Sequence, residues 1–146
     1  MPTFTFFDEF KKYLGDGTID LDTHTFKLFL TSTAPNAGTN TVRADLTAGE
    51  VSNGNGYTTG GVALTSVTWS ETGAGTGIWR FTSADVSWTA SGGDFTATRY
   101  FILYDDTPTS PADPLVGYLD YGASFTLTNG NTLTFDVGAS GIFTLQ

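Results

Sequence analysis

The segment FTATRYFILYDDTPTSPADPLVGYLDY, residues 95–121, contains the strongest strand pattern in the chain. Successive residues of an extended chain point to opposite faces of a sheet. In its first part, Phe95–Tyr104, this places Phe95, Ala97, Phe101 and Leu103 on one face and Thr96, Thr98, Tyr100, Ile102 and Tyr104 on the other. Both faces are rich in aromatic and β-branched residues, which suit a pleated, covered surface. We therefore predict a strand that is buried on both sides.

The second part of the segment predicts a long hairpin. Asp105 to Pro114 interrupts the alternation with three prolines and three aspartates, which are unsuited to a central strand. The alternation resumes in Leu115–Tyr121, with Leu115, Gly117, Leu119 and Tyr121 expected on one face. Two strands joined by a stiff acidic loop are expected to form the centre of the fold.

Shorter strand patterns occupy most of the remaining chain. They are Thr25–Thr33, Val62–Glu71, Ile78–Phe81, Asp85–Ala90, Ala123–Thr128, Thr132–Val137 and Gly141–Leu145. Gly- and Asn-rich turn signals separate them, and we expect hairpins at Thr72–Gly77, Ser91–Asp94 and Asn129–Asn131. The pattern predicts a mainly β protein, an antiparallel β-sandwich or barrel of about eight strands in a single domain covering residues 1–146.

Thr3–Leu14 is the one good helix candidate. Phe6, Phe10, Tyr13 and Leu14 have the spacing of one helix face, with Thr5 as the predicted N-cap and Gly15 just past the C-terminus. The helix either packs over one end of its own sheet, which we favour, or docks on a partner.

Ala34–Gly61 is a long polar segment rich in Asn, Gly and Thr. Segments of this length without regular structure are uncommon in compact domains and often serve in binding, and a short helix or turn near Val42–Leu46 would shorten the irregular part. This segment and the N-terminal segment are the predicted interaction surface. Its candidate residues are Phe4, Phe6, Phe7, Phe10, Val42, Leu46 and Tyr57.

Composition argues against several classes of function. The net charge of −9 and the six scattered basic residues argue against binding to nucleic acid phosphates. The chain has no cysteine, which excludes disulfides and thiolate chemistry. No apolar run is long enough for a membrane span and no signal peptide pattern is present. We therefore expect no nucleic acid, membrane or cofactor partner.

No residue pattern predicts an enzyme or a metal site. His24 is the single histidine and is expected at a turn surface, and no G-x-S-x-G motif occurs. Asp105, Asp106 and Asp113 are expected in a rigid solvated loop, although calcium binding or paired-carboxylate chemistry there stays open. Trp69, Trp79 and Trp88 are more simply packing residues than a carbohydrate platform.

Most of the chain resembles a family of small virion proteins of tailed bacteriophages. The resemblance rests on FTFFDEFKKYLGDGTIDLDTHTFKLFLT, NGNGYTTGGVAL with the following VTW, VSWTASGGDFTATRY, YDDTPTSPADPLVGYLDYG and GNTLTFDVGASGIFTL. It implies a place in a phage particle, and it transfers no residue-level role.

The resemblance and the composition together lead to an expected function. We expect a non-enzymatic capsid decoration (cement) protein that binds the major capsid protein and stays on the virion after assembly in the host cytoplasm. A homo-oligomer is expected, and capsid symmetry suggests a trimer. The alternatives are a tail, baseplate or fibre-associated component, and a carbohydrate-binding module that contacts the host surface.

Overall fold

A computed structural model describes residues 3–146, and these residues form antiparallel sheets with two short helices. The fold is mainly β and sandwich-like, as predicted, and its strands number ten instead of about eight. In chain order the elements are β1 (Phe4–Phe6), α1 (Asp8–Gly15), β2 (Phe26–Thr31), the 3₁₀ helix η1 (Arg43–Gly49), β3 (Val62–Ala63), β4 (Thr68–Glu71), β5 (Trp79–Thr82), β6 (Val86–Thr89), β7 (Thr98–Asp105), β8 (Leu115–Phe125), β9 (Thr132–Phe135) and β10 (Phe143–Leu145).

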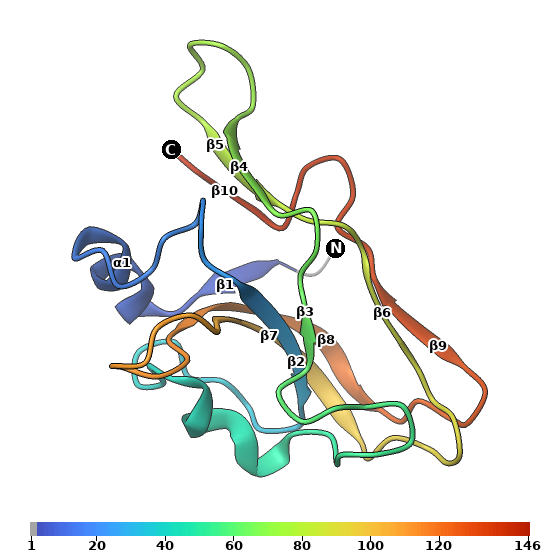
Figure 1. The fold of residues 1–146 in the computed structure, drawn as a ribbon. Coiled ribbons are helices and arrows are strands. Elements are labelled where there is room, and N and C mark those ends of the chain that lie inside the picture. Colours follow the sequence, from blue (N-terminus) through green and yellow to red (C-terminus); the bar gives the residue numbers. More distant parts are fainter. Residues whose placement is uncertain (1–2) are drawn as a thin grey trace.

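The predicted central hairpin is confirmed. Strands β7 and β8 pair at the middle of a five-stranded sheet with the order β1-β8-β7-β2-β3 (Figure 1). The two smaller sheets have the orders β10-β5-β4 and β6-β9.

Both faces of β7 are buried, as its sequence predicts. Phe101 and Leu103 belong to the main core, which also contains residues of the two smaller sheets such as Phe81, Trp88 and Phe135. Tyr100, Ile102 and Tyr104 lie in a second core on the opposite face, under Leu46 of η1. The large sheet is therefore the middle layer, which is why its central strands are apolar on both sides.

One face assignment in β8 was wrong. Leu103 pairs with Gly117 and Tyr104 pairs with Leu115, so the register shifts by one residue at Val116. Because of this irregularity, the Leu115 side chain points into the second core. Val116 lies in the main core, and Leu119 packs against it. A bulge of this kind cannot be read from alternation alone, because it changes the phase of the pattern.

The two predicted turns Ser91–Asp94 and Asn129–Asn131 do not close hairpins between neighbouring strands. Strand β6 pairs with β9 instead, and Trp88 stands opposite Leu133. The two turns lie against each other, since the Asp94 carboxylate accepts from the Asn129 amide at 2.8 Å. Burying Trp88, which is 2% exposed, determines this pairing more strongly than the local turn signals.

The predicted strand Val62–Glu71 is divided between two sheets. β3 pairs with β2, and β4 pairs with β5 across the predicted turn at Thr72–Gly77. Ser66, between them, has a positive φ of 53°. The chain thus leaves one sheet and enters another where a single strand was expected.

The N-terminal segment is a strand followed by a helix, so the prediction of one helix over Thr3–Leu14 was wrong at its start. Phe4–Phe6 pair with Gly117–Leu119 of β8, which takes up the backbone of Thr5 and removes it as a cap. The N-cap is Phe7, with no side-chain hydrogen bond, and Gly15 is the last helical residue. Phe10 and Tyr13 are buried in the main core, so the helix packs on its own domain, as we favoured.

The long polar segment Ala34–Gly61 is ordered by η1 and by one buried carboxylate. Glu50 Oε1 accepts from the Gly60 amide at 2.6 Å and from the Tyr57 hydroxyl at 3.0 Å. Its Oε2 accepts from Arg43 Nη2 at 2.6 Å. The predicted short helix near Val42–Leu46 is present as η1.

Among residues 3–146, no helix has the length and apolar character needed to cross a bilayer.

Candidate interaction surface

The residues predicted as an interaction surface lie mostly inside the domain. Phe7 and Leu46 belong to the second core and Phe10 and Tyr57 to the main core, and each is at most 2% exposed. These four are therefore closed to a partner in this fold, because the large sheet needs large apolar side chains on both of its faces.

The other three predicted residues are half-buried. Phe4 stacks on the Phe143 ring at 5.5 Å between ring centroids, and Phe6 contacts the same ring edge-on at 5.0 Å. Val42 makes an isolated bridge with Pro114. The seven predicted residues therefore lie in or beside the main core, in the second core, or next to Pro114, and they do not form one surface.

The loop that begins at Asp105 is anchored rather than fully solvated. The Asp105 side chain is completely buried, and its Oδ2 lies 2.6 Å from His24 Nδ1. Burial raises the pKa of Asp105, and this effect outweighs the opposing hydrogen bonds from His24 and Thr107. His24 Nδ1 also lies 3.3 Å from the Asp20 amide, which is a donor, so a protonated Asp105 would let Nδ1 accept from both neighbours. The expected solvated position of Asp105 was wrong, whereas His24 lies at a bend with 22% of its side chain exposed.

A second buried polar cluster surrounds Arg43. Its guanidinium lies over the rings of Phe29 and Tyr104, at 5.4 and 5.6 Å, and binds Glu50. Burial raises the pKa of Tyr57 and of Tyr104, so both hydroxyls stay neutral donors. Because each charged group here has a partner within the domain, the cluster holds the polar segment on the sheet.

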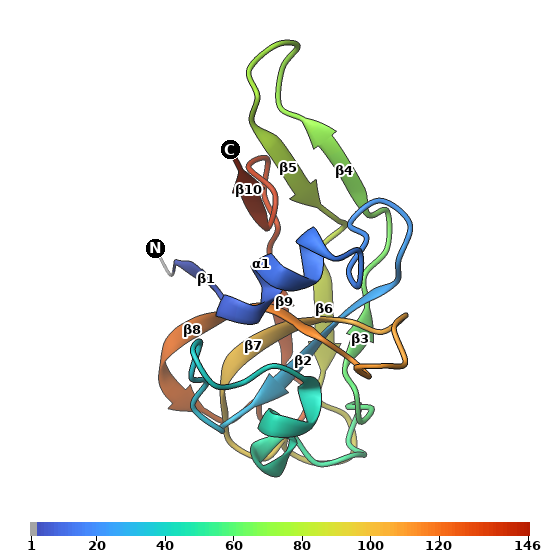
Figure 2. The ribbon, with the colours of Figure 1, turned by 90° about the vertical axis from the view of Figure 1, so that its left-hand side faces the viewer.

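The β4–β5 hairpin, residues 68–82, is a projecting feature of the structure, and we call it the arm. Figures 1 and 2 show the arm extending away from the body of the domain, with β10 alongside β5. Its pairing is regular, from Thr68 opposite Thr82 to Glu71 opposite Trp79. The arm therefore carries side chains beyond the two cores.

The tip of the arm is held by Glu71. Its carboxylate accepts from the Gly75 amide at 3.1 Å and from the Gly77 amide at 2.7 Å. Thr72 N donates to Ile78 O at 2.8 Å and closes the base of the turn. Charge-assisted bonds of this kind fix a loop before any partner arrives.

One face of the arm continues the apolar core into solvent. Phe81 and Phe143 are buried and stacked at 5.1 Å, Trp69 is half-buried beside Phe143, and Trp79 is 43% exposed. The rings of Trp69 and Trp79 lie 5.7 Å apart. Aromatic exposure thus increases along the arm from its base, and Trp79 and Tyr121 are the large exposed hydrophobic residues of the described chain.

A cleft of about 290 Å³, the arm cleft, lies where the arm meets the end of α1 and the turn after it. It is lined by Leu14, Gly17, Ile19, Asp20, Leu21, Asp22, Trp69 and Leu145. Thr23 holds Asp20 through a 2.7 Å bond from its hydroxyl, and this bond, with the Asp22 amide, lowers the pKa of Asp20. The arm cleft therefore combines an apolar floor with an acidic rim.

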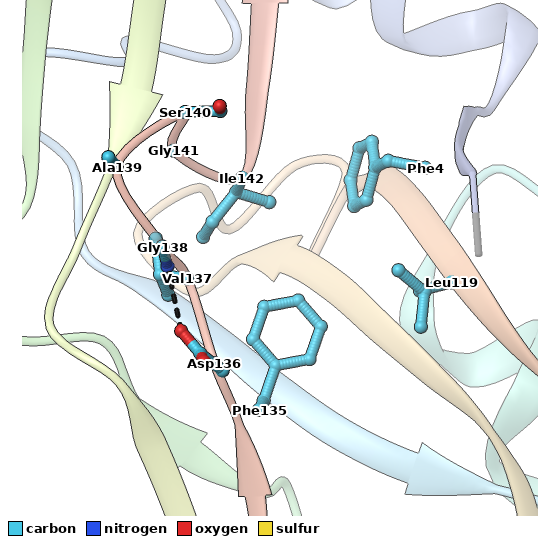
Figure 3. Close-up of a pocket in the computed structure, with 10 residues that line it drawn as sticks. All are labelled: Phe4, Leu119, Phe135, Asp136, Val137, Gly138, Ala139, Ser140, Gly141 and Ile142. Atoms are coloured by element: carbon cyan, nitrogen blue, oxygen red, sulfur yellow. Dashed lines mark hydrogen bonds between the residues drawn. The ribbon is translucent and has the colours of Figure 1, made fainter. Parts of the chain in front are cut away.

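A second hollow lies between β8 and the chain around β9 (Figure 3). Phe4 and Leu119 lie on one side of it and the 135–142 segment on the other, around about 390 Å³. A smaller hollow of about 230 Å³ shares Leu119, Phe135 and Asp136 with it and reaches Tyr121. Apolar side chains dominate both.

The sequence indicated part of the aromatic face of the arm. The sequence predicts Trp69 and Trp79 as packing residues, one on each of two strands that flank the turn at Thr72–Gly77, and the observed register places them on one face. Their joint exposure was missed, because it depends on how far the arm extends beyond the body. Within residues 3–146 no group of three or more His, Cys, Asp or Glu side chains is placed to hold a metal ion.

Comparison of the chain with protein-family models, with curated proteins and with solved structures finds no match in any of the three.

Proposed function

We propose that this chain is a non-enzymatic structural protein of a bacteriophage virion, a capsid decoration protein that binds the major capsid protein through its arm. The observation that carries the proposal is the projecting arm, with a fixed tip and an aromatic face that leads out of the core. The sequence resemblance to small virion proteins supports the placement in a particle.

The arm has the properties of a protein-binding element. Exposed tryptophans contribute strongly to binding where they become buried against a partner. A tip fixed by Glu71 loses little conformational entropy on binding, which leaves more of the contact energy for affinity. The outer edge of β4 is also free among the described strands, and an extended partner segment can pair with such an edge.

The test uses particles assembled without this chain, to which the purified chain is then added. We expect such particles to release DNA at a lower temperature than complete particles, and we expect the added chain to restore the release temperature at saturation. The Trp79→Ala variant should restore it less well than Tyr121→Ala, which removes the other exposed aromatic side chain.

Two outcomes overturn the capsid proposal in favour of a different role. Heads of unchanged stability combined with lost infectivity would place the chain in the tail, baseplate or fibre. Saturable quenching of tryptophan fluorescence by soluble sugars, lost in Trp79→Ala, would instead favour a carbohydrate-binding module.

A further inference from the structure

We propose that the arm cleft binds a segment of a partner protein that combines a large apolar side chain with an adjacent lysine or arginine. The proposal rests on the proposed function only in taking the partner to be a protein. It specifies the site, the chemistry of the segment and the role of each part of the cleft.

The floor of the cleft fits an apolar side chain. Leu14, Ile19, Leu21, Trp69 and Leu145 come from α1, the following turn, β4 and β10, and together they surround about 290 Å³. This volume suits one or two side chains of a peptide, since sites for whole small molecules start at roughly 300 Å³ and extend to about 1,000 Å³. Ile19 and Leu21 are buried, so the floor is fixed by the domain itself.

The rim of the cleft is acidic and favours a basic neighbour. Asp20 and Asp22 line it, Asp16 precedes the lining residue Gly17, and Glu71 shares the arm face with the tryptophans. In the described part of the chain, every ion pair uses other acids, so these four carboxylates have no lysine or arginine partner there. Hydrogen bonds from Thr18 lower the pKa of Asp16. Hydrogen bonds from Thr23 and Asp22 lower the pKa of Asp20. Both carboxylates therefore stay charged at neutral pH.

Trp79, next to the cleft, also favours a partner with a lysine or arginine side chain. Its ring adjoins that of Trp69 and is 43% exposed. An arginine guanidinium or lysine ammonium stacks favourably on an exposed indole within about 6 Å. An apolar group in the cleft and a cation between the aspartates and Trp79 would thus satisfy both parts of the site.

Charge also argues against a second copy of this chain as the occupant. Each copy carries a net charge of −9, and five of its six basic side chains already bond to groups of their own chain. Two copies meeting at an acidic rim would repel each other. A different, basic protein surface is the complementary partner.

The first experiment measures binding of two synthetic peptides to the full chain by its tryptophan fluorescence. Both peptides lack tryptophan and contain the same leucines, and one carries arginines where the other carries glutamates. We expect saturable binding of the arginine peptide alone, weakening as salt is raised. Equal binding of both peptides, or of neither, would overturn the proposal.

Matched variants separate the cleft from the general negative charge of the chain. The Asp22 and Asp8 side chains are both exposed and accept no hydrogen bond in the structure, so Asp22→Asn and Asp8→Asn make the same charge change at different places. We expect Asp22→Asn to weaken the arginine peptide by about two- to fivefold and Asp8→Asn to leave it unchanged. Trp79→Ala should weaken it by about fivefold or more. Equal effects of the two asparagine variants would show only non-specific attraction and contradict the site.

Photo-crosslinking in the particle distinguishes failure of this inference from failure of the proposed function. A photoreactive residue replaces Leu145, the half-buried floor residue contributed by β10, and the crosslinked partner peptide is identified by mass spectrometry. A partner peptide with an apolar residue next to lysine or arginine is expected. A chain that is absent from particles yet binds the arginine peptide would overturn the proposed function alone. A chain that is present but crosslinks to a segment without a basic residue would overturn the inference alone.

Discussion

Gly117 shows how a single missing side chain positions the N-terminal strand. A Cβ at this residue would overlap the Phe4 ring and would lie 2.7 Å from the Thr5 carbonyl oxygen. Strand β1 can therefore pair with β8 only because residue 117 has no side chain. The sequence showed a glycine in an alternating strand, but not which ring would lie over it.

We predict that Gly117→Ala lowers the free energy of unfolding by about 1–3 kcal/mol, the usual cost of overpacking. Urea unfolding followed by tryptophan fluorescence measures this change. Gly15→Ala is the control, because a Cβ at the end of α1 meets no atom within 4 Å and should be neutral or stabilising. Equal stability of Gly117→Ala and the wild type would contradict the described packing of β1.

Asp105 gives a pH dependence with a definite sign. Its pKa in the folded protein is raised, chiefly by burial, so the folded state holds this proton to higher pH than the unfolded chain does. Its contribution to stability is then fully present below the unfolded pKa of about 3.9 and falls as pH rises through the raised value. Relative to Asp105→Asn, the wild type should lose stability as the pH increases over this range.

Denaturant unfolding of both proteins at several pH values measures this difference. Asp120→Asn supplies a control of opposite sign, since the bidentate bond from Arg99 lowers the pKa of Asp120 and its contribution is lost as pH falls. A wild-type advantage over Asp105→Asn that grows with pH would contradict the account of Asp105. The pair of Asp105 and His24 was beyond sequence reasoning, because 81 positions separate the two residues.

At the scale of elements, patterns located most strands but only some of their pairings: the β4–β5 and β7–β8 hairpins formed as expected, and two other expected hairpins did not. The β7–β8 hairpin was predictable because two long alternating stretches are separated by a single loop with three prolines and three aspartates. The pairing of β6 with β9 was not, since Ser91–Asp94 and Asn129–Asn131 both have the composition of hairpin turns. Turn residues act over a few positions, whereas pairing depends on which apolar faces can be buried together.

The arm provides the element-scale prediction. Replacing Glu71 by alanine removes the acceptor for the Gly75 and Gly77 amides, and a hydrogen bond to a charged group contributes about 1.5–3 kcal/mol. We expect amide exchange at these two glycines to accelerate by about tenfold or more, with little change in the main core.

Amide exchange measured by NMR tests this prediction, with Glu9→Ala as the control. Glu9 also bonds to a group of its own chain, Lys12, but lies on α1 away from the tip. Unchanged exchange at Gly75 and Gly77 in Glu71→Ala would show that the turn is held by its other hydrogen bonds instead.

At the scale of the whole molecule, composition predicted the fold class but not the location of the candidate surface. The glycine- and aromatic-rich, cysteine-free chain indicated short strands and tight turns, and the structure has this character. Four of the predicted interaction residues are buried because large apolar side chains in this fold are first needed inside it, as Phe7 and Leu46 are. The arm became visible only once the three-stranded sheet and its relation to the body were known.

The most direct test of the proposed function is the copy number of this chain relative to the major capsid protein in purified particles. Quantitative mass spectrometry of peptides from both proteins gives this ratio. A decoration protein bound across the capsid lattice predicts amounts of the same order as the capsid protein. A ratio of about a few per cent or less, or absence from the particles, would contradict the capsid role.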